Sequence, residues 1–423
     1  MISPAPPVAD LTPPWDAADA APTIDPIEQF TAARARHGDT FGLRSGDRDY
    51  LVTFSSTGMQ SFYGLEESEA SKGVADWRML RRKVGDDLFR GRRTLPHDMF
   101  GRSDAERYRH VLAHAIRTEL DLLGNDGEFE IFGWTRRLGH RLGLASWGAP
   151  TFVDHADFDA LVTHLDLLDP SDVFVRPDIS PQRNAVDQAL EAAVELIGSM
   201  SADSGNAYDH GWGDIVARWA DQPDGVARRG AALDLILVHL GSMSNLFAAT
   251  GWMIVDLLSH PAICHQALGD TALLEGCALE STRLAQRSIM LREVVAEYVL
   301  FDTGDQVYEV GRGTTIATLL PVLNTSAAPG LDRYDPSRWS RRRLISAPGS
   351  SAPEPRELVT AFGHGRHSCP AQPFSLHAMC ASAAALLESF ELTPRFDTVE
   401  PQRVQIGGVA RSQTPCMVTY HRC

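Results

Sequence analysis

The stretch from Phe362 to Gln372, FGHGRHSCPAQ, combines one cysteine with two histidines and two glycines. Gly363 and Gly365 allow a tight turn with a close approach of the backbone, and Pro370 suits the first turn of a following helix. A helix N-terminus and neighbouring basic groups favour a thiolate at Cys369. These features are typical of a metal-bound sulfur whose basicity is tuned by backbone N–H groups.

Other roles for this cysteine are open at this point. His364, His367 and Cys369 could bind one zinc ion, but structural zinc sites commonly use paired ligands, and no second pair accompanies these three. A nucleophilic cysteine needs a positioned histidine and an orienting group, which spacing cannot show. Burial as a small hydrophobic residue is the interpretation for the other cysteines, Cys264, Cys277, Cys380, Cys416 and Cys423.

Composition indicates a folded soluble protein. The 423 residues are 43% hydrophobic and 22% charged, with a net charge of −16, which argues against a nucleic-acid surface. Residues 1–25 have no apolar signal region and form a predicted flexible lead-in, and no apolar run approaches the roughly 20 residues that a bilayer requires. Sparse cysteines indicate reduced thiols, so we expect a cytoplasmic protein without a membrane partner.

Hydrophobic periodicity predicts a mainly α protein with small β-sheets. The predicted helices span 26–38, 103–123 with a cap at Ser103 or Asp104, 231–260, 271–287 and 374–390. A hairpin is predicted around residues 45–47, short strands after residue 293, and irregular structure over 324–361. The helix at 231–260 is apolar on nearly all faces, so it should run through the centre of the protein.

The cysteine loop resembles the haem-ligand loop of the cytochrome P450 family, F-G-x-G-x-[HR]-x-C-x-[GA], and matches it at every specified position. Glu280-Ser281-Thr282-Arg283 resembles the E-x-x-R of the same family, and Arg333 falls where the third member of its Glu-Arg-Arg network is expected. The resemblance implies the single-chain triangular fold of a soluble bacterial member, with residues 26–423 as one catalytic domain.

The resemblance also implies a cofactor, haem b, with the Cys369 thiolate as the axial ligand of the iron. Phe362 and Gly363 belong to the loop that holds it. Arg292 and His367 are expected to bind the haem propionates, with Arg107, Arg109 and His110 as weaker candidates. Dioxygen would be the co-substrate, with electrons ultimately from NAD(P)H.

On the helix expected above the haem, the sequence departs from the family pattern [AG]-G-x-[DE]-T. Gly241-Ser242-Met243-Ser244-Asn245 has Ser244 for the acid and Asn245 for the alcohol. Serine cannot release a proton near neutral pH, and an Asn amide donates a hydrogen bond without titrating. Both could instead be satisfied polar residues of a bent helix. Leu237 and Leu240 are expected near the substrate pocket. His239 is expected to be a packed core histidine, with proton relay or contact with substrate in that pocket as the alternative.

The leading functional hypothesis is a monooxygenase that oxidises a small organic molecule, such as a specialised metabolite. It would receive electrons from a ferredoxin and its reductase, docking near Arg338, Arg341, Arg342 and Arg343. The missing acid–alcohol pair motivates an alternative, a reductant-independent isomerase, dehydratase or peroxide-using enzyme. A haem sensor without catalysis is a third hypothesis.

Overall fold

The computed structural model describes residues 2–11, 25–45, 48–172, 182–203, 211–344 and 356–423. Most of the predicted lead-in, the tip of the predicted hairpin at residues 46 and 47, and residues 345–355 of the region predicted to be irregular lie outside these ranges. The helices are α1 (Pro26–His37), α2 (Ser56–Gly64), α3 (Lys72–Leu80), α4 (Arg102–Leu123), α5 (Ile131–Trp147), α6 (Pro150–Val153), α7 (Phe158–Leu168), α8 (Arg183–Asp203), α9 (Gly211–Ala217), α10 (Asp224–Ser259), α11 (Pro261–Gly269), α12 (Thr271–Ala285), α13 (Leu320–Ser326) and α14 (Gln372–Ser389).

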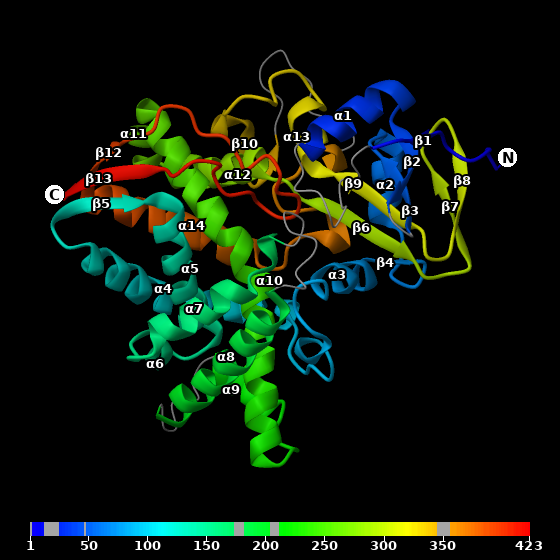
Figure 1. Cartoon of the computed structure of the whole chain (residues 1–423). Coiled ribbons are helices and arrows are strands. Elements are labelled where there is room, and N and C mark those ends of the chain that lie inside the picture. Colours follow the sequence, from blue (N-terminus) through cyan, green and yellow to red (C-terminus); the bar gives the residue numbers. More distant parts are fainter. Residues whose placement is uncertain (1, 12–24, 46–47, 173–181, 204–210, 345–355) are drawn as a thin grey trace.

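The strands form small sheets at the edges of the helical body. They are β1 (Val8–Ala9), β2 (Thr40–Ser45), β3 (Arg48–Thr53), β4 (Ala70–Ser71), β5 (Asp126–Glu130), β6 (Ile289–Val294), β7 (Tyr298–Asp302), β8 (Val307–Gly311), β9 (Thr315–Leu319), β10 (Trp339–Ser340), β11 (Arg343–Leu344), β12 (Phe390–Pro394) and β13 (Met417–Arg422). The outline is triangular, because a broad upper body narrows towards the start of α10 (Figure 1). The predicted mainly α fold with small β-sheets is confirmed.

The largest sheet has the strand order β1-β2-β3-β9-β6-β4. The predicted hairpin is its β2–β3 pair, in which Thr40 faces Thr53 and Ser45 faces Arg48. Strand β1 pairs in parallel with β2, and Leu11 is buried, so this part of the predicted flexible lead-in is instead ordered against the sheet. The sheet supports β6, whose Arg292 belongs to the site described below.

Helix α1 begins at a capped N-terminus and ends at a glycine, as its sequence predicts. The Asp25 carboxylate accepts a hydrogen bond from the Ile27 amide, and Gly38 adopts a φ of 88° after the last turn. Helix α4 differs slightly from the prediction, because Gly101 occupies the cap position. The Asp104 side chain accepts from the Gly101 amide at 2.9 Å, and neither Ser103 nor Asp104 is the cap residue itself.

Helix α10 is the central element and packs along α5 (Figure 1). Its 36 residues start earlier than predicted, directly after Pro223, because its first turns are polar and exposed and therefore lack the apolar pattern. By length and composition it could cross a membrane, but 72% of its most apolar window is buried inside the protein. Helix α10 is therefore the core helix of this fold.

Glycines bring α5 and α10 close together. A Cβ at Gly139 of α5 would collide with the Phe247 ring of α10, and a Cβ at Gly251 of α10 would lie 2.7 Å from the Phe132 ring of α5. Glycine inside a helix costs stability relative to alanine. Here it permits close packing of aromatic rings between the two helices, which fixes the position of α10.

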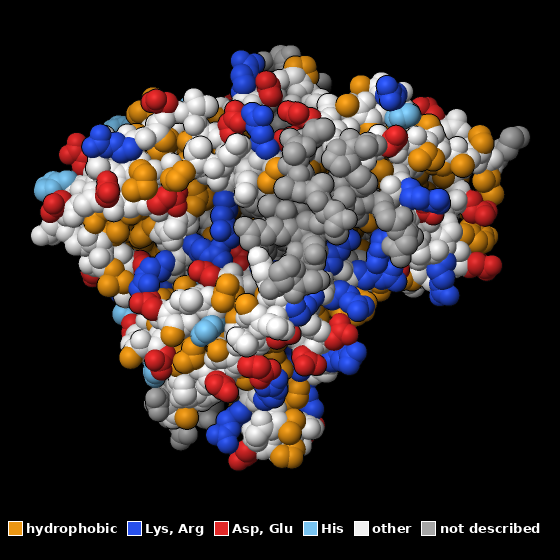
Figure 2. All heavy atoms as spheres, viewed as in Figure 1, with side chains coloured by type: hydrophobic (Ala, Val, Ile, Leu, Met, Phe, Trp, Pro, Cys, Tyr) orange, Lys and Arg blue, Asp and Glu red, His pale blue; other side chains and the backbone are white. Residues whose placement is uncertain are grey.

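A three-stranded sheet of order β12-β13-β5 joins the C-terminus to the start of α5. The Tyr420 hydroxyl donates to the Leu123 carbonyl at 2.5 Å, at the end of α4. The side chains on the face drawn in Figure 2 are mixed, with basic and acidic residues interspersed over its described part.

We expect Gly139→Ala to lower the free energy of unfolding by roughly 1–3 kcal/mol, since the added methyl group overpacks the α5–α10 interface. Thermal unfolding followed by circular dichroism measures this. Gly198→Ala is the matched control, because a Cβ at Gly198 of α8 meets nothing within 4 Å, and it should stabilise by roughly 0.5–1 kcal/mol. Equal effects of the two substitutions would contradict the packing argument.

Candidate active site

The cysteine loop is held in shape by glycine and by its own backbone. Gly363 has a φ of 77°, and a Cβ there would collide with the His367 carbonyl oxygen. The Cys369 amide donates to the Phe362 carbonyl at 2.7 Å, which closes the loop. Helix α14 follows directly, and its first turn contains Pro373, whereas Pro370 lies in the preceding turn.

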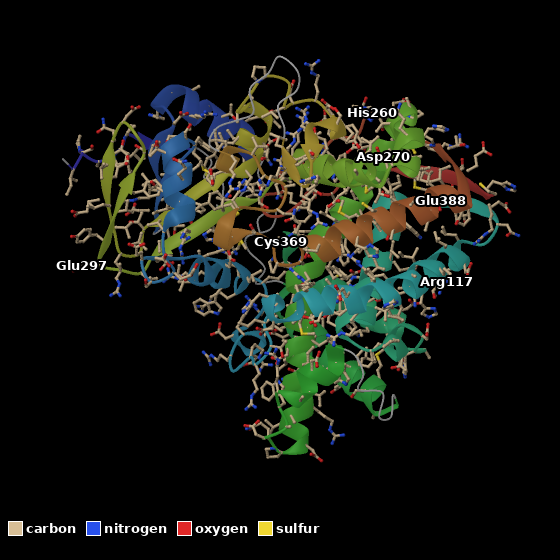
Figure 3. The ribbon with its side chains drawn as sticks, turned by 180° about the vertical axis from the view of Figure 1, so that it is seen from behind. Arg117, His260, Asp270, Glu297, Cys369 and Glu388 are labelled. Carbon is tan, nitrogen blue, oxygen red and sulfur yellow. The ribbon has the colours of Figure 1, made fainter. Side chains whose placement is uncertain are left out.

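The sulfur of Cys369 faces backbone donors at the start of α14. Burial raises the pKa of the thiol, whereas the amides of Ala371 and Gln372 and the charge of Lys72 lower it. Two N–H donors and a nearby cation are the surroundings that a metal-bound thiolate requires. Figure 3 shows Cys369 in the middle of the molecule, close to where α14 passes α10.

A basic cluster lies beside the loop. Arg292 of β6 is 1% exposed, and its guanidinium donates to Nε2 of His367. The charge of Lys72, at the start of α3, lowers the pKa of the same histidine, and Lys72 itself pairs with Asp76. The carboxylate of Glu67, which is 58% exposed, lies 3.7 Å from Arg292. Arg292 is therefore the buried cation of this cluster, whereas Lys72, Asp76 and Glu67 lie nearer the surface.

The protonation of His367 follows from this geometry. Burial, Arg292 and Lys72 lower the pKa of His367 to about 4, so the ring is neutral at physiological pH. Because Nε2 accepts from Arg292, the ring proton lies on Nδ1, which is buried and has no hydrogen-bond partner among the residues that the structure describes. An N–H donor of this kind, next to the buried guanidinium of Arg292, suits a carboxylate, so these residues fit a haem propionate.

The zinc and nucleophile hypotheses lack the necessary geometry. Nε2 of His364 lies 2.9 Å from the Val359 carbonyl, and His367 is engaged with Arg292, so neither ring turns to the sulfur. Among the described residues, no three His, Cys, Asp or Glu side chains are grouped so as to hold a metal ion. Of the cysteines expected to be buried, Cys277 and Cys416 are buried, Cys264 and Cys380 are partly buried, and Cys423 is exposed.

The weaker propionate candidates do not join the cluster. Arg107 pairs with Asp104 at 2.7 Å and with Asp214 at 3.0 Å. Arg109 and His110 are exposed on α4. Arg109 instead borders an open hollow of about 340 Å³, together with Arg102, Arg342, Pro370 and Phe374. This hollow lies on the outer side of the cysteine loop.

The residues of α10 that were predicted to face the haem or the substrate differ in their exposure. Gly241 and Asn245 are exposed, although Leu240, Met243 and Leu246 beside them are buried. His239 does not lie in an open pocket, because it packs against α5 and lies 2.8 Å from Nδ1 of His140. Leu237 and Leu240 are 8% and 9% exposed.

Asn245 is tied to the segment before β13. Its Oδ1 accepts from the Val409 amide at 2.8 Å, and a Cβ at Gly408 would collide with the same oxygen. Gly408 has a φ of 68°, so both its backbone and its missing side chain allow this contact. Since the oxygen is engaged, the donor end of the amide is the part that remains for a bound molecule.

The charge network around Glu280 contains a different arginine from the one predicted. Glu280 and Arg283 are fully buried and joined by hydrogen bonds of 2.7 and 2.8 Å. The third partner is Arg338, whose Nε lies 2.9 Å from Glu280, and the Trp339 indole adds a bond of 2.8 Å. Arg333 is exposed and has no hydrogen bond to Glu280 within the described part of the chain. The 3-10 turn Pro336–Arg338 directs Arg338 inwards, so the prediction of Arg333 was wrong.

The network around Glu280 also removes one of the four arginines that were predicted to dock a ferredoxin. The Arg338 side chain is 11% exposed and engaged by Glu280, so it is not available to a partner protein. Arg341, Arg342 and Arg343 are exposed at the β10–β11 turn, where Arg342 pairs with Glu275.

The comparisons with known proteins agree with this site. Residues 256–420 match the family model described as Cytochrome P450. Sterol 14-demethylase of Arabidopsis thaliana is 31% identical over 136 residues, which cover 31% of this chain and 26% of the plant protein. The chain therefore aligns with about a quarter of the length of this relative. The matched region includes the whole cysteine loop from Phe362 to Gln372. Residues 256–420 are therefore similar to the cytochrome P450 family.

Sequence reasoning missed Lys72, Trp339 and Arg338 as parts of these networks. Trp339 directly follows Arg338 in DPSRW, so a proline-started turn ending in Arg-Trp was an available signal for that pair. No sequence motif around Lys72 indicates its position. It comes near the cysteine loop because β4, directly before α3, pairs with β6.

We expect Glu280→Gln to destabilise the protein by roughly 3–5 kcal/mol and to weaken haem retention, because it leaves Arg283 and Arg338 without their buried counter-charge. Thermal unfolding and the haem content of purified protein measure both effects.

Glu275→Gln is the control, since its ion pair with Arg342 lies at the surface and should change stability by less than about 1 kcal/mol. If Glu280→Gln were as mild as this control, the proposed role of the network would be wrong.

Proposed function

We propose that this protein is a haem-thiolate monooxygenase that inserts one oxygen atom of dioxygen into a small organic substrate. The observation that carries the proposal is the Cys369 sulfur, which faces the amides of Ala371 and Gln372 beside the basic cluster of Arg292, His367 and Lys72. Haem b, when bound through a cysteine thiolate, supplies the chemistry that favours O–O bond cleavage.

Each part of the loop has a defined task in this proposal. The amides of Ala371 and Gln372 stabilise the thiolate form of Cys369 and moderate its basicity. Arg292, the Nδ1–H of His367 and Lys72 would hold the haem carboxylates by charge-assisted hydrogen bonds. Phe362 fixes the loop through its carbonyl, which accepts from the Cys369 amide.

On the side of the haem opposite Cys369, α10 would offer a hydrogen-bond donor from Asn245 and a hydroxyl group from Ser244. The amide nitrogen of Asn245 is the free end of a side chain whose oxygen is engaged by Val409. It would orient oxygen or water by donating a hydrogen bond, without releasing a proton. Leu237 and Leu240 supply apolar surface from the same helix, which favours an apolar substrate.

Electron delivery is proposed at the hollow behind the cysteine loop. Arg102, Arg109 and Arg342 line it, with Glu106 as the acidic lining residue. These charges would attract an acidic ferredoxin, reduced by NAD(P)H through its reductase. Such a partner is consistent with a cytoplasmic protein that acts on a specialised metabolite.

A second candidate function is a reductant-independent isomerisation, dehydration or peroxide-driven oxidation. It is favoured by Ser244 and Asn245, which lack the titratable acid that usually accompanies proton delivery.

The monooxygenase proposal predicts product only when NAD(P)H, ferredoxin and its reductase are all present, with labelled oxygen from dioxygen in the product. Mass spectrometry after incubation with a substrate panel measures this. The panel should include sterols, since the plant relative is named for one. Conversion that is equally fast without reductant would support the second candidate instead.

The docking proposal predicts that Arg109→Glu slows haem reduction by ferredoxin, and that the salt dependence of this rate becomes weaker. Stopped-flow absorbance at several ionic strengths measures both.

Arg117→Glu is the matched control, because Arg117 is exposed on the same helix but lies far from Cys369 (Figure 3). Unchanged reduction in Arg109→Glu, or an equal loss in Arg117→Glu, would contradict this docking site.

A further inference from the structure

A hollow lies between α3 and the largest sheet. Its floor is a row of polar side chains across three neighbouring strands, because Thr315 of β9 pairs with Tyr50 of β3 on one side and with Glu293 of β6 on the other. Directly paired residues of adjacent strands face the same side of a sheet. Helix α3 lies against β6 (Figure 1). Three arginines complete the polar lining of the hollow, namely Arg48, Arg78 and Arg82.

This hollow is separated from the haem-binding residues by β6 itself. Successive residues of a strand point to opposite faces of the sheet. Arg292 reaches His367 of the cysteine loop on one face, whereas Glu293 meets Arg78 of α3 on the other. A molecule bound in the hollow would therefore occupy a site distinct from that of the haem.

The lining residues carry more guanidinium groups than carboxylates. Glu293 is the one acid among them, and it forms an ion pair with Arg78 at 2.6 Å. Arg82 follows Arg78 by one helical turn on the same side, where two like charges repel each other. An anion placed between these side chains would offset that repulsion.

Arg48 brings a further positive charge to the mouth of the hollow. Its side chain is half-buried at the start of β3. The adjacent carboxylate, that of Asp49, pairs with Arg44 instead, and Arg48 has no ion pair within the described part of the chain. Arg48 therefore has donors to offer to a bound anion.

Glu293 adds a buried acceptor to these donors. The residue is 4% exposed. Its Oε2 lies 2.6 Å from Nη1 of Arg78, but the two groups are not aligned for a hydrogen bond, and Oε2 has no hydrogen-bond partner among the described residues. Buried polar atoms normally have a partner. A ligand that suits the hollow must therefore bring acceptors for the arginines and one donor for Glu293.

We propose that this hollow binds a hydrogen phosphate group, either as the free ion or as the end of a phosphate monoester. The phosphate oxygens would accept hydrogen bonds from the three arginines, and the P–OH group would donate to Oε2 of Glu293. Sulfate has the same tetrahedral shape but carries no proton at neutral pH. It would place a charged oxygen against the buried carboxylate with no donor between them, so Glu293 selects phosphate over sulfate.

The size of the hollow limits what can bind there. Its volume of about 20 Å³ exceeds the roughly 10–15 Å³ that one water molecule requires. It therefore accepts one small group and not a whole organic substrate. The Arg78 side chain is 36% exposed, so the hollow reaches solvent, and the flexible arginine side chains there can move apart around a phosphate.

Isothermal titration calorimetry of the haem-loaded protein with inorganic phosphate and with sulfate, at neutral pH and matched ionic strength, tests the proposal. We expect phosphate to bind at least about tenfold more tightly than sulfate, because only phosphate donates to the buried carboxylate. In Glu293→Gln the two affinities should lie within about twofold of each other, since a neutral amide accepts from phosphate and donates to sulfate. Glycerol phosphate, as a third ligand, distinguishes a monoester site from a site for the free ion.

Arg48→Gln should weaken phosphate binding by at least about tenfold. It breaks no ion pair of the described residues, so it gives a result even if Glu293→Gln folds poorly. Arg81→Gln is the matched control, because Arg81 directly precedes Arg82 but is exposed and lies 3.9 Å from Asp86, outside the hollow. It should leave phosphate affinity within about twofold.

A wild-type protein that binds no phosphate, or that binds sulfate equally well, would overturn the proposal. An equal loss of phosphate affinity in Arg48→Gln and Arg81→Gln would overturn it too, since the effect would then come from net charge alone. None of these measurements depends on the proposed monooxygenase reaction.

Discussion

The orientation of one sulfur atom is the constraint on which the rest of the structure depends. The amides of Ala371 and Gln372 lie at the sulfur of Cys369 and lower the pKa of the thiol. A loop can hold this shape only if Gly363 adopts its positive φ and if the Cys369 amide closes onto Phe362. Everything else in the site is placed relative to that atom.

Buried charges fix the elements around the sulfur. Glu280 joins α12 to the segment that contains Arg338, and Asp169 joins the end of α7 to α5 and to the segment before β13. Each carboxylate receives several donors, which offsets the cost of removing it from water. Removing one partner of such a network leaves a buried charge uncompensated. The networks therefore hold the joined helices and segments in one arrangement.

Local patterns allowed much of this to be predicted. The cysteine loop, the boundaries of α1, α12 and α14 and the apolar α10 follow from nearby residues, because turns, caps and periodicity are local properties. Local patterns could not show whether Arg333 or Arg338 binds Glu280, because this depends on how the turn at Pro336 packs against α12.

Long-range contacts were beyond such patterns. Nothing near Asp169 in the sequence marks it as a partner of Arg136, and nothing near Lys72 marks it as a neighbour of Cys369. These residues meet because α5, α7 and α10 pack together and because β4 pairs with β6. His239 shows the reverse case, in which a polar residue on the central helix faces α5 and not the site.

The most direct test of the account is the absorption spectrum of the reduced, carbon monoxide-bound protein after loading with haem. The account predicts the red-shifted Soret band of thiolate-ligated haem in the wild-type protein and in Cys264→Ser, and its loss in Cys369→Ser. A wild-type protein that binds haem without this band, or a Cys369→Ser variant that keeps it, would contradict the assignment of Cys369 as the iron ligand.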